Sequence, residues 1–319
     1  MTGILPSARE VRDAHARIHS YVKRTPLVLS RELSAHCGGE VYLKLECQQD
    51  GGSFKLRGAL NALLSLSDAE RAAGVVASSA GNHGIGVAMA AERLGIRATL
   101  FVPAMSPTVK RDKIAARGAT VDTTQPNYDA AEDAARDFAT RTGATFVSPC
   151  TGRALLAGAG TVALEMFADL PTLRTLVVCV GGGGLVGGIG GYVRDAAAGA
   201  RILGAQSERT NAMALALEQG HAVDIPDLPT LADGLAGRVD DAMYQQGREA
   251  LDAIVTVDEE SIASAIKFLN DTQRIVVEGS GAVGVAALRS GRLVPQAFPV
   301  GVTISGANID RTTWDDLVR

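Results

Sequence analysis

The chain has 319 residues, of which 46% are hydrophobic and 21% charged, as in a globular protein with room for one large domain or two ordinary ones. Its formal net charge is −4, and charges of both signs are mixed along the chain, which argues against a nucleic-acid or anionic-membrane partner. Aromatic residues are scarce at 4% and glycine is abundant at 36 residues, a balance that argues against an all-β sandwich.

Helical and strand patterns alternate along the chain. Residues 7–21 predict a helix, because Ser7 and Glu10 form a capping box at its start. The other expected helices are, in chain order, 54–66, 82–94, 108–117, 128–142 and 160–169. Strands are expected at 40–46, 74–78, 98–103, 120–123, 144–148 and 175–180. This alternation predicts an α/β protein with parallel-rich sheets flanked by helices.

The expected elements between residues 67 and 147 repeat a short helix-and-strand unit. They predict a small domain at 67–147, inserted in a large domain made of residues 1–66 and 148–319. Proteins with two such lobes usually bind their ligand in the cleft between them.

The sequence also predicts a cellular location. Its N-terminus becomes amphipathic and charged almost at once, unlike a secretory signal. The most apolar stretch, residues 177–193, contains eight glycines, so we do not expect a membrane span there. The four cysteines show no CxxC or Cys/His spacing, which indicates isolated thiols in a reducing cytoplasm. They are Cys37, Cys47, Cys150 and Cys179.

A glycine run, Gly181-Gly182-Gly183-Gly184, and then Leu185 follow an expected strand and precede a helical pattern. Consecutive glycines let backbone N–H groups converge, and the helix start adds the positive end of its dipole, a combination that binds phosphate. No Lys-Ser/Thr pair follows, so this is not a Walker loop. By itself the segment leaves phosphate binding and a tight structural turn equally open.

Lys55 lies in a stretch of small and apolar residues at the start of an expected helix. Burial and the positive end of the helix dipole both disfavour an ammonium ion there, and a neutral amine is what a Schiff-base lysine must supply. A surface lysine on an amphipathic helix is the alternative, and the chemistry of this segment alone favours that alternative.

Two further segments follow expected strands. Residues 78–84, Ser-Ser-Ala-Gly-Asn-His-Gly, open a helix, where small side chains and exposed amides suit a carboxylate or a phosphate. Within it, the Asn82 amide could serve a phenolate oxygen, whereas we interpret His83 as a satisfied capping or core histidine. Residues 303–308 contain Ser305, whose hydroxyl could hydrogen-bond a ring nitrogen.

Four motifs in this order resemble the threonine/serine dehydratase and serine racemase family of fold-type II pyridoxal 5′-phosphate (PLP) enzymes. They are SFKLRGA at 53–59, SAGNHG at 79–84, GGGG at 181–184 and SGAN at 305–308. The resemblance implies that Lys55 carries PLP as a Schiff base, with Phe54 beside the ring, Asn82 bonded to the 3′-oxygen and Ser305 facing the pyridine nitrogen.

The resemblance also implies the remaining contacts. The cofactor phosphate would be held by the amides of Gly181, Gly182, Gly183, Gly184 and Leu185. The substrate carboxylate would lie against Ser79, Ala80, Gly81, Asn82 and His83. A homodimer is expected.

The chain departs from the family pattern at two places. Serine racemases of the family carry a serine where this chain has Ala80, and that hydroxyl is their acid/base on the opposite face of the substrate carbon. The family's cation site corresponds here to Glu208, Ala212 and Ala214, so one carboxylate is missing and we expect no metal.

The expected reaction is therefore β-elimination of an L-threonine- or L-serine-type amino acid to a 2-oxo acid and ammonia. Three alternatives stay open: an amino-acid racemase, a dehydratase of the hydroxyaspartate or hydroxyectoine pathways, and a PLP-binding protein without catalysis.

Overall fold

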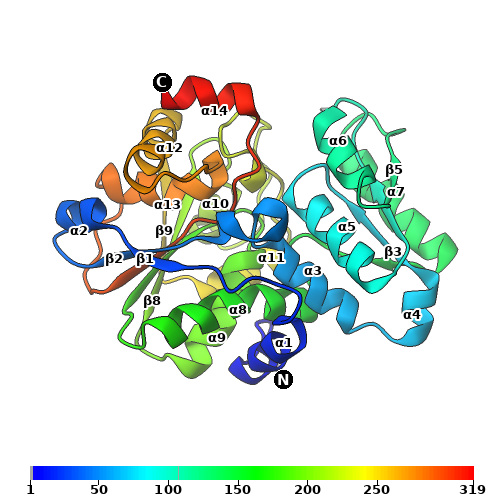
Figure 1. The fold of residues 1–319 in the computed structure, drawn as a ribbon, viewed down its shortest axis with the longest axis horizontal. Helices are drawn as coiled ribbons and strands as arrows, with labels where there is room; N and C mark the ends of the chain where they lie inside the picture. Colours follow the sequence, from blue (N-terminus) through cyan, green and yellow to red (C-terminus); the bar gives the residue numbers. More distant parts are fainter. Residues whose placement is uncertain (1–2, 107) are drawn as a thin grey trace.

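The structure, a computed structural model, describes residues 3–106 and 108–319. Its strands form a six-stranded sheet in the order β1-β2-β10-β7-β8-β9 and a four-stranded sheet in the order β5-β4-β3-β6 (Figure 1). Strand β1 is antiparallel to β2, and the other neighbouring pairs are parallel. The expected α/β class with parallel-rich sheets is confirmed. The strands are β1 (Leu27–Leu29), β2 (Val41–Lys44), β3 (Val75–Ser78), β4 (Ala98–Phe101), β5 (Thr120–Asp122), β6 (Thr145–Phe146), β7 (Thr175–Cys179), β8 (Arg201–Ser207), β9 (Ala253–Val257) and β10 (Val300–Thr303).

The helices connect these strands and cover the sheets. They are α1 (Ala8–Ile18), α2 (Arg31–Cys37), α3 (Lys55–Leu64), α4 (Asp68–Ala73), α5 (Asn82–Leu94), α6 (Thr108–Ala115), α7 (Tyr128–Thr142), α8 (Arg153–Asp169), α9 (Gly184–Ala196), α10 (Ala212–Gln219), α11 (Asp241–Ala250), α12 (Glu259–Gln273), α13 (Gly279–Arg289) and α14 (Arg311–Val318). Short 3₁₀ turns occur at η1 (Glu46–Gln48), η2 (Asp50–Gly52) and η3 (Asp233–Leu235). Among the described residues, no helix is both long enough and apolar enough to cross a membrane.

The central strands of the larger sheet lie between two helical layers. Helices α8 and α9 pack together with α1 on one side, and α12 and α13 lie on the other (Figure 1). Every residue of β7 and β10 is therefore buried. Parallel strands covered on both faces are expected to be buried along their whole length rather than at alternate residues. β7 and β10 show this pattern.

The four strands of the smaller sheet all lie within residues 67–147. The two sheets are joined through helix α5, which packs on β3, β4 and α3. The contact with α3 is close: a Cβ added at Gly86 would lie 3.1 Å from the carbonyl carbon of Lys55. The division of the chain into two domains stays a prediction.

Several expected boundaries agree with the structure. Helix α1 begins with the predicted capping box, in which Ser7 and Glu10 bond each other's backbone N–H groups. Helices α5 and α7 have the bounds that the sequence pattern predicts.

The start of α8 was predicted wrongly. We expected this helix at 160–169, but it begins at Arg153. A Cβ at Gly158 would lie 2.5 Å from the carbonyl oxygen of Arg57, and one at Gly160 would lie 2.6 Å from that of Gly188. These two glycines thus serve close packing of α8 against α3 and α9.

A cluster of four buried charged side chains anchors the first turn of α3 through Arg57. Arg57 donates to both carboxylate oxygens of Glu46, at 2.8 and 2.9 Å, and of Glu165, at 2.7 and 2.8 Å. Lys44 Nζ donates to Glu165 at 2.6 Å and to the Thr25 carbonyl at 2.7 Å. We call Lys44, Glu46, Arg57 and Glu165 the buried charge cluster; each side chain is at most 1% exposed.

Candidate functional site

Lys55 is the first residue of α3, and its side chain reaches the connection between the two sheets. Its Nζ donates to the carbonyl oxygen of Pro149 at 2.9 Å and lies 5.3 Å from the centre of the Phe54 ring. Pro149 belongs to the turn that joins β6 to α8. The structure therefore brings Lys55 and Phe54 to the place where the chain returns from the smaller sheet to the larger one.

The segment before Lys55 runs beside the loop that follows β10. The Phe54 N–H donates to the carbonyl oxygen of Ser305 at 3.1 Å, and Ser53 pairs with Gly306 in a β-bridge. The Ser305 hydroxyl is buried next to Cys179, the last residue of β7. Burial raises the pKa of the Cys179 thiol to about 11, although a hydrogen bond with Ser305 acts in the opposite direction.

The glycine run forms the turn between β7 and α9. Gly183, with φ +85°, is the N-cap of α9, so no side chain caps this end and its backbone N–H groups remain available. A Cβ at Gly182 would lie 2.7 Å from Cys150 Sγ, and one at Gly184 would lie 3.1 Å from Cys150 Cα. The run thus packs against the residue after Pro149. Close packing and an uncapped helix N-terminus are both present here.

Residues 79–81 form the turn between β3 and α5, at the carboxyl end of β3, and residues 82 and 83 begin the helix. The Ser79 hydroxyl accepts a hydrogen bond from the Gly81 N–H at 3.1 Å. Gly81 is the N-cap of α5, so the first amides of this helix also lack a capping side chain. Ala80 is only partly buried. This turn has the free helix N-terminus that the sequence predicted for an anionic group.

Asn82 has two partners that sequence reasoning missed. Its Nδ2 donates to Glu278 Oε1 at 2.6 Å, and its Oδ1 accepts from Asn308 Nδ2 at 2.6 Å. Glu278 is buried and is the N-cap of α13. The one signal for it in the sequence is another glycine-rich helix start, Gly-Ser-Gly at 279–281, directly after Glu278.

His83 is a buried core residue, as expected, but only one of its ring nitrogens is paired. Its Nε2 lies 2.9 Å from the Val147 carbonyl oxygen. Its Nδ1 finds no hydrogen-bond partner among the described residues. Burial and the positive charge of Lys55 lower the pKa of His83 to about 3, so its ring is neutral near pH 7.

The residues at the family's cation site take other partners. Glu208 lies 3.5 Å from the guanidinium of Arg292, and the Ala214 N–H donates to Gln206 Oε1 at 2.9 Å. In the part of the chain that the structure describes, no group of three or more His, Cys, Asp or Glu side chains is placed to hold a metal ion.

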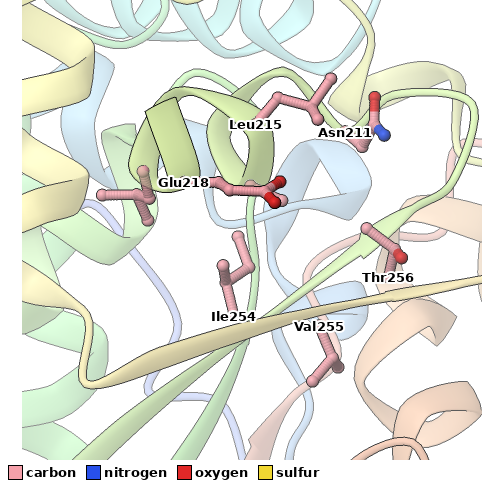
Figure 2. Close-up of a pocket in the computed structure, with 8 residues that line it drawn as sticks. Asn211, Leu215, Glu218, Ile254, Val255 and Thr256 are labelled. Carbon is pink, nitrogen blue, oxygen red and sulfur yellow. The ribbon is translucent and has the colours of Figure 1, made fainter. Parts of the chain in front are cut away.

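Two hollows of the surface lie away from the four motifs. Figure 2 shows a pocket of about 560 Å³ between α10 and the edge strand β9. A second, of about 600 Å³, lies between the N-terminal segment and α9. Neither is lined by a residue of the motifs. The candidate site is instead where Lys55 and the glycine run meet the turn at Pro149 and Cys150. The first pocket is lined by Asn211, Ala214, Leu215, Leu217, Glu218, Ile254, Val255 and Thr256.

The chain is similar to known proteins along most of its length. A family model described as pyridoxal-phosphate dependent enzyme matches residues 18–306. An L-threonine ammonia-lyase of Thermotoga maritima is 41% identical over 97% of this chain and 77% of its own length. The structure of maize serine racemase superposes with a TM-score of 0.93 at 31% identity, over 98% of this chain and 97% of that one. The processed form of threonine deaminase isoform 2 from Solanum lycopersicum superposes with a TM-score of 0.91 at 30% identity, over 99% of this chain and 90% of that one.

Proposed function

Since the chain belongs to the pyridoxal-phosphate dependent enzyme family, we propose that it is an ammonia-lyase that dehydrates a β-hydroxy amino acid of the L-threonine or L-serine type. Its products would be a 2-oxo acid and ammonia. The observation that carries the proposal is that Lys55 and the glycine run both meet the turn at Pro149 and Cys150. Similarity to an L-threonine ammonia-lyase and a threonine deaminase supports the choice of reaction.

The residues at this site fit the polar groups of PLP. The uncapped start of α9, with Gly183 in a left-handed conformation, suits the phosphate. The buried Ser305 hydroxyl suits the pyridine nitrogen, an N–H of Asn82 suits the phenolic oxygen, and the Lys55 amine suits the aldehyde. When bound, PLP supplies an electron sink for the negative charge that develops at the substrate α-carbon.

The proposed roles of the side chains follow from their positions. Lys55 Nζ removes the α-proton, and the Pro149 carbonyl holds that nitrogen in place. The free amides at the start of α5 bind the substrate carboxylate. The C–O bond to the β-carbon then breaks, and the hydroxyl takes up the proton that Lys55 removed and leaves as water. Water hydrolyses the released enamine to the 2-oxo acid and ammonia.

Ser305 favours elimination over other fates. A hydroxyl can share a hydrogen bond with the ring nitrogen, but it cannot stabilise a full positive charge there as a carboxylate would. The electron sink is therefore weaker, and prompt loss of the β-hydroxyl competes well with reprotonation.

Borohydride reduction followed by peptide mapping tests the assignment of the lysine. The adduct is expected on Lys55, and an adduct on Lys267 or any other lysine would overturn it. A panel of β-hydroxy amino acids assayed for 2-oxo acid then identifies the substrate. A cofactor spectrum that no amino acid changes would favour a non-catalytic PLP-binding protein.

The second candidate is an amino-acid racemase, which the likeness to maize serine racemase favours. Racemisation needs proton donors on both faces of the α-carbon, whereas elimination needs one base and a leaving hydroxyl. Lys55 would serve one face, and we propose that Ala80 lies at the other, where its methyl group has no exchangeable proton. We therefore expect 2-oxo acid with little inverted amino acid.

Substitution Ala80→Ser tests this choice. It should raise racemisation relative to elimination, modestly, because the new hydroxyl must also be positioned. Chiral chromatography of the unreacted amino acid measures both outcomes, with Ala80→Gly as the matched control without a hydroxyl. An unmodified enzyme that inverts its substrate as fast as it eliminates would show that another residue protonates that face.

We also propose a cytoplasmic location and a homodimer. All four cysteines are free thiols, which supports a reducing compartment. Light scattering during size-exclusion chromatography measures the oligomeric state.

A further inference from the structure

We propose that Asn308 is a positioning residue that fixes which side of the Asn82 carboxamide faces the cofactor. The inference rests on the proposed binding of PLP beside Asn82, and not on the identity of the substrate. Asn308 follows β10, whereas Asn82 opens α5 beside the smaller sheet, so the contact ties the two sheets together across the site.

The hydrogen bonds of Asn308 leave its own amide one orientation. Its Nδ2 lies 2.7 Å from the Gly51 carbonyl oxygen and 2.6 Å from Asn82 Oδ1. A carbonyl oxygen only accepts, so the nitrogen of Asn308 must face Gly51. The same nitrogen uses its second hydrogen on Asn82. Turning the Asn308 amide would set two oxygens against each other at Gly51.

This arrangement determines the orientation of Asn82. Its oxygen must face Asn308, because an amide nitrogen there would meet another donor. Its nitrogen then donates one hydrogen to Glu278 Oε1 at 2.6 Å and keeps one hydrogen for a ligand. Toward the cofactor, Asn82 is therefore a donor and not an acceptor.

Nearby glycines leave the space that these bonds need. A Cβ at Gly306 would lie 2.2 Å from Glu278 Oε1, and one at Gly52 would lie 3.1 Å from Asn308 Nδ2. Gly306 is also tied to the segment before Lys55 through its bridge with Ser53. The position of Asn308 is thus set by backbone on both sides.

A donor and an acceptor at this point have opposite effects on the cofactor. A donated hydrogen bond stabilises an ionised phenolic oxygen, whereas an amide oxygen there would repel it. If Asn82 turns, the bound cofactor should hold its proton more tightly, and the pH midpoint of its visible absorption should rise.

Substitution Asn308→Asp tests the proposal, because it keeps the shape and replaces the donor by an acceptor. An acceptor at position 308 opposes Asn82 Oδ1, whereas Glu278 still accepts from Asn82 Nδ2, so the amide loses its fixed orientation and donates less fully to the cofactor. We expect the pH midpoint of cofactor absorption, measured on the holoenzyme without substrate, to rise by about one to two units, as for the loss of a hydrogen bond to a charged group. Part of this rise comes from the new negative charge, so Asn308→Ala, which removes the bond without adding a charge, is the decisive variant and should show a smaller rise.

The control is Asn270→Asp, at a site on α12 where the side-chain nitrogen contacts Asp271. It should leave the midpoint unchanged. A merely structural role for Asn308 would lower the melting temperature of Asn308→Ala without moving its midpoint, and that result would overturn the proposal. Because no turnover is needed, the titration gives its answer even where no amino acid proves to be a substrate. Failure of the unmodified protein to bind PLP would instead count against the proposed function.

Discussion

Lys55 and Arg57 lie two residues apart on α3, on opposite sides of its first turn, and the protein treats their charges differently. Arg57 is sealed in the buried charge cluster, where it also donates to Thr161 and to the Lys23 carbonyl, both at 3.2 Å. Among the described residues, Lys55 has the Pro149 carbonyl as its hydrogen-bond partner. Arg57, whose N–H groups have many hydrogen-bond partners, holds the helix in place. Lys55, which has one, remains available for chemistry.

The largest expected effect is the loss of turnover when Lys55 is replaced. Lys55→Ala should lower turnover by about 10²–10⁴-fold, the contribution typical of a positioned acid–base group. Its melting temperature should stay close to that of the parent, because one hydrogen bond is lost. Steady-state kinetics and calorimetry measure the two. Turnover above a hundredth of the parent rate would show that another base serves the reaction.

The next effect is on stability rather than turnover and concerns Arg57. Arg57→Met should lower the free energy of unfolding by about 3–5 kcal/mol, because Glu46 and Glu165 would stay buried without their partner. Urea denaturation measures it. Arg117→Met is the matched control, since that arginine pairs with Glu92 at the surface and should cost at most about 1 kcal/mol. Equal losses in the two variants would mean that the cluster does not hold the fold.

The smallest expected effect appears only in acid and concerns the buried His83. Burial and the Lys55 charge lower its pKa from 6.5 to about 3, so between these values the unfolded chain binds a proton that the folded protein does not. Stability should therefore fall as the pH falls below 6.5, by up to about 1.4 kcal/mol per pH unit. His83→Gln should remove this part of the acid dependence, as followed by urea denaturation from pH 7 to pH 4. An unchanged slope would place the acid sensitivity elsewhere.

What the sequence could predict follows from how local each signal is. Helices α5 and α7 were placed correctly because capping and periodicity lie within the segments themselves. The buried charge cluster could not be predicted, since Arg57 meets Glu165 from 108 residues away. The partner of Asn82 at Glu278 is 196 residues away, and the Pro149 carbonyl has no side-chain signature at all. The early start of α8 was missed for the same reason, because its glycines serve other helices.

The closeness of α5 to Lys55 limits which sequences this protein can explore. A methyl group at Gly86 would press on the peptide that joins Lys55 to Leu56, at 3.1 to 3.2 Å. A change at this contact displaces the backbone that carries the reactive amine. A library that diversifies residues 67–147 to alter substrate preference should therefore hold Gly86 constant, in addition to the buried strands of the smaller sheet.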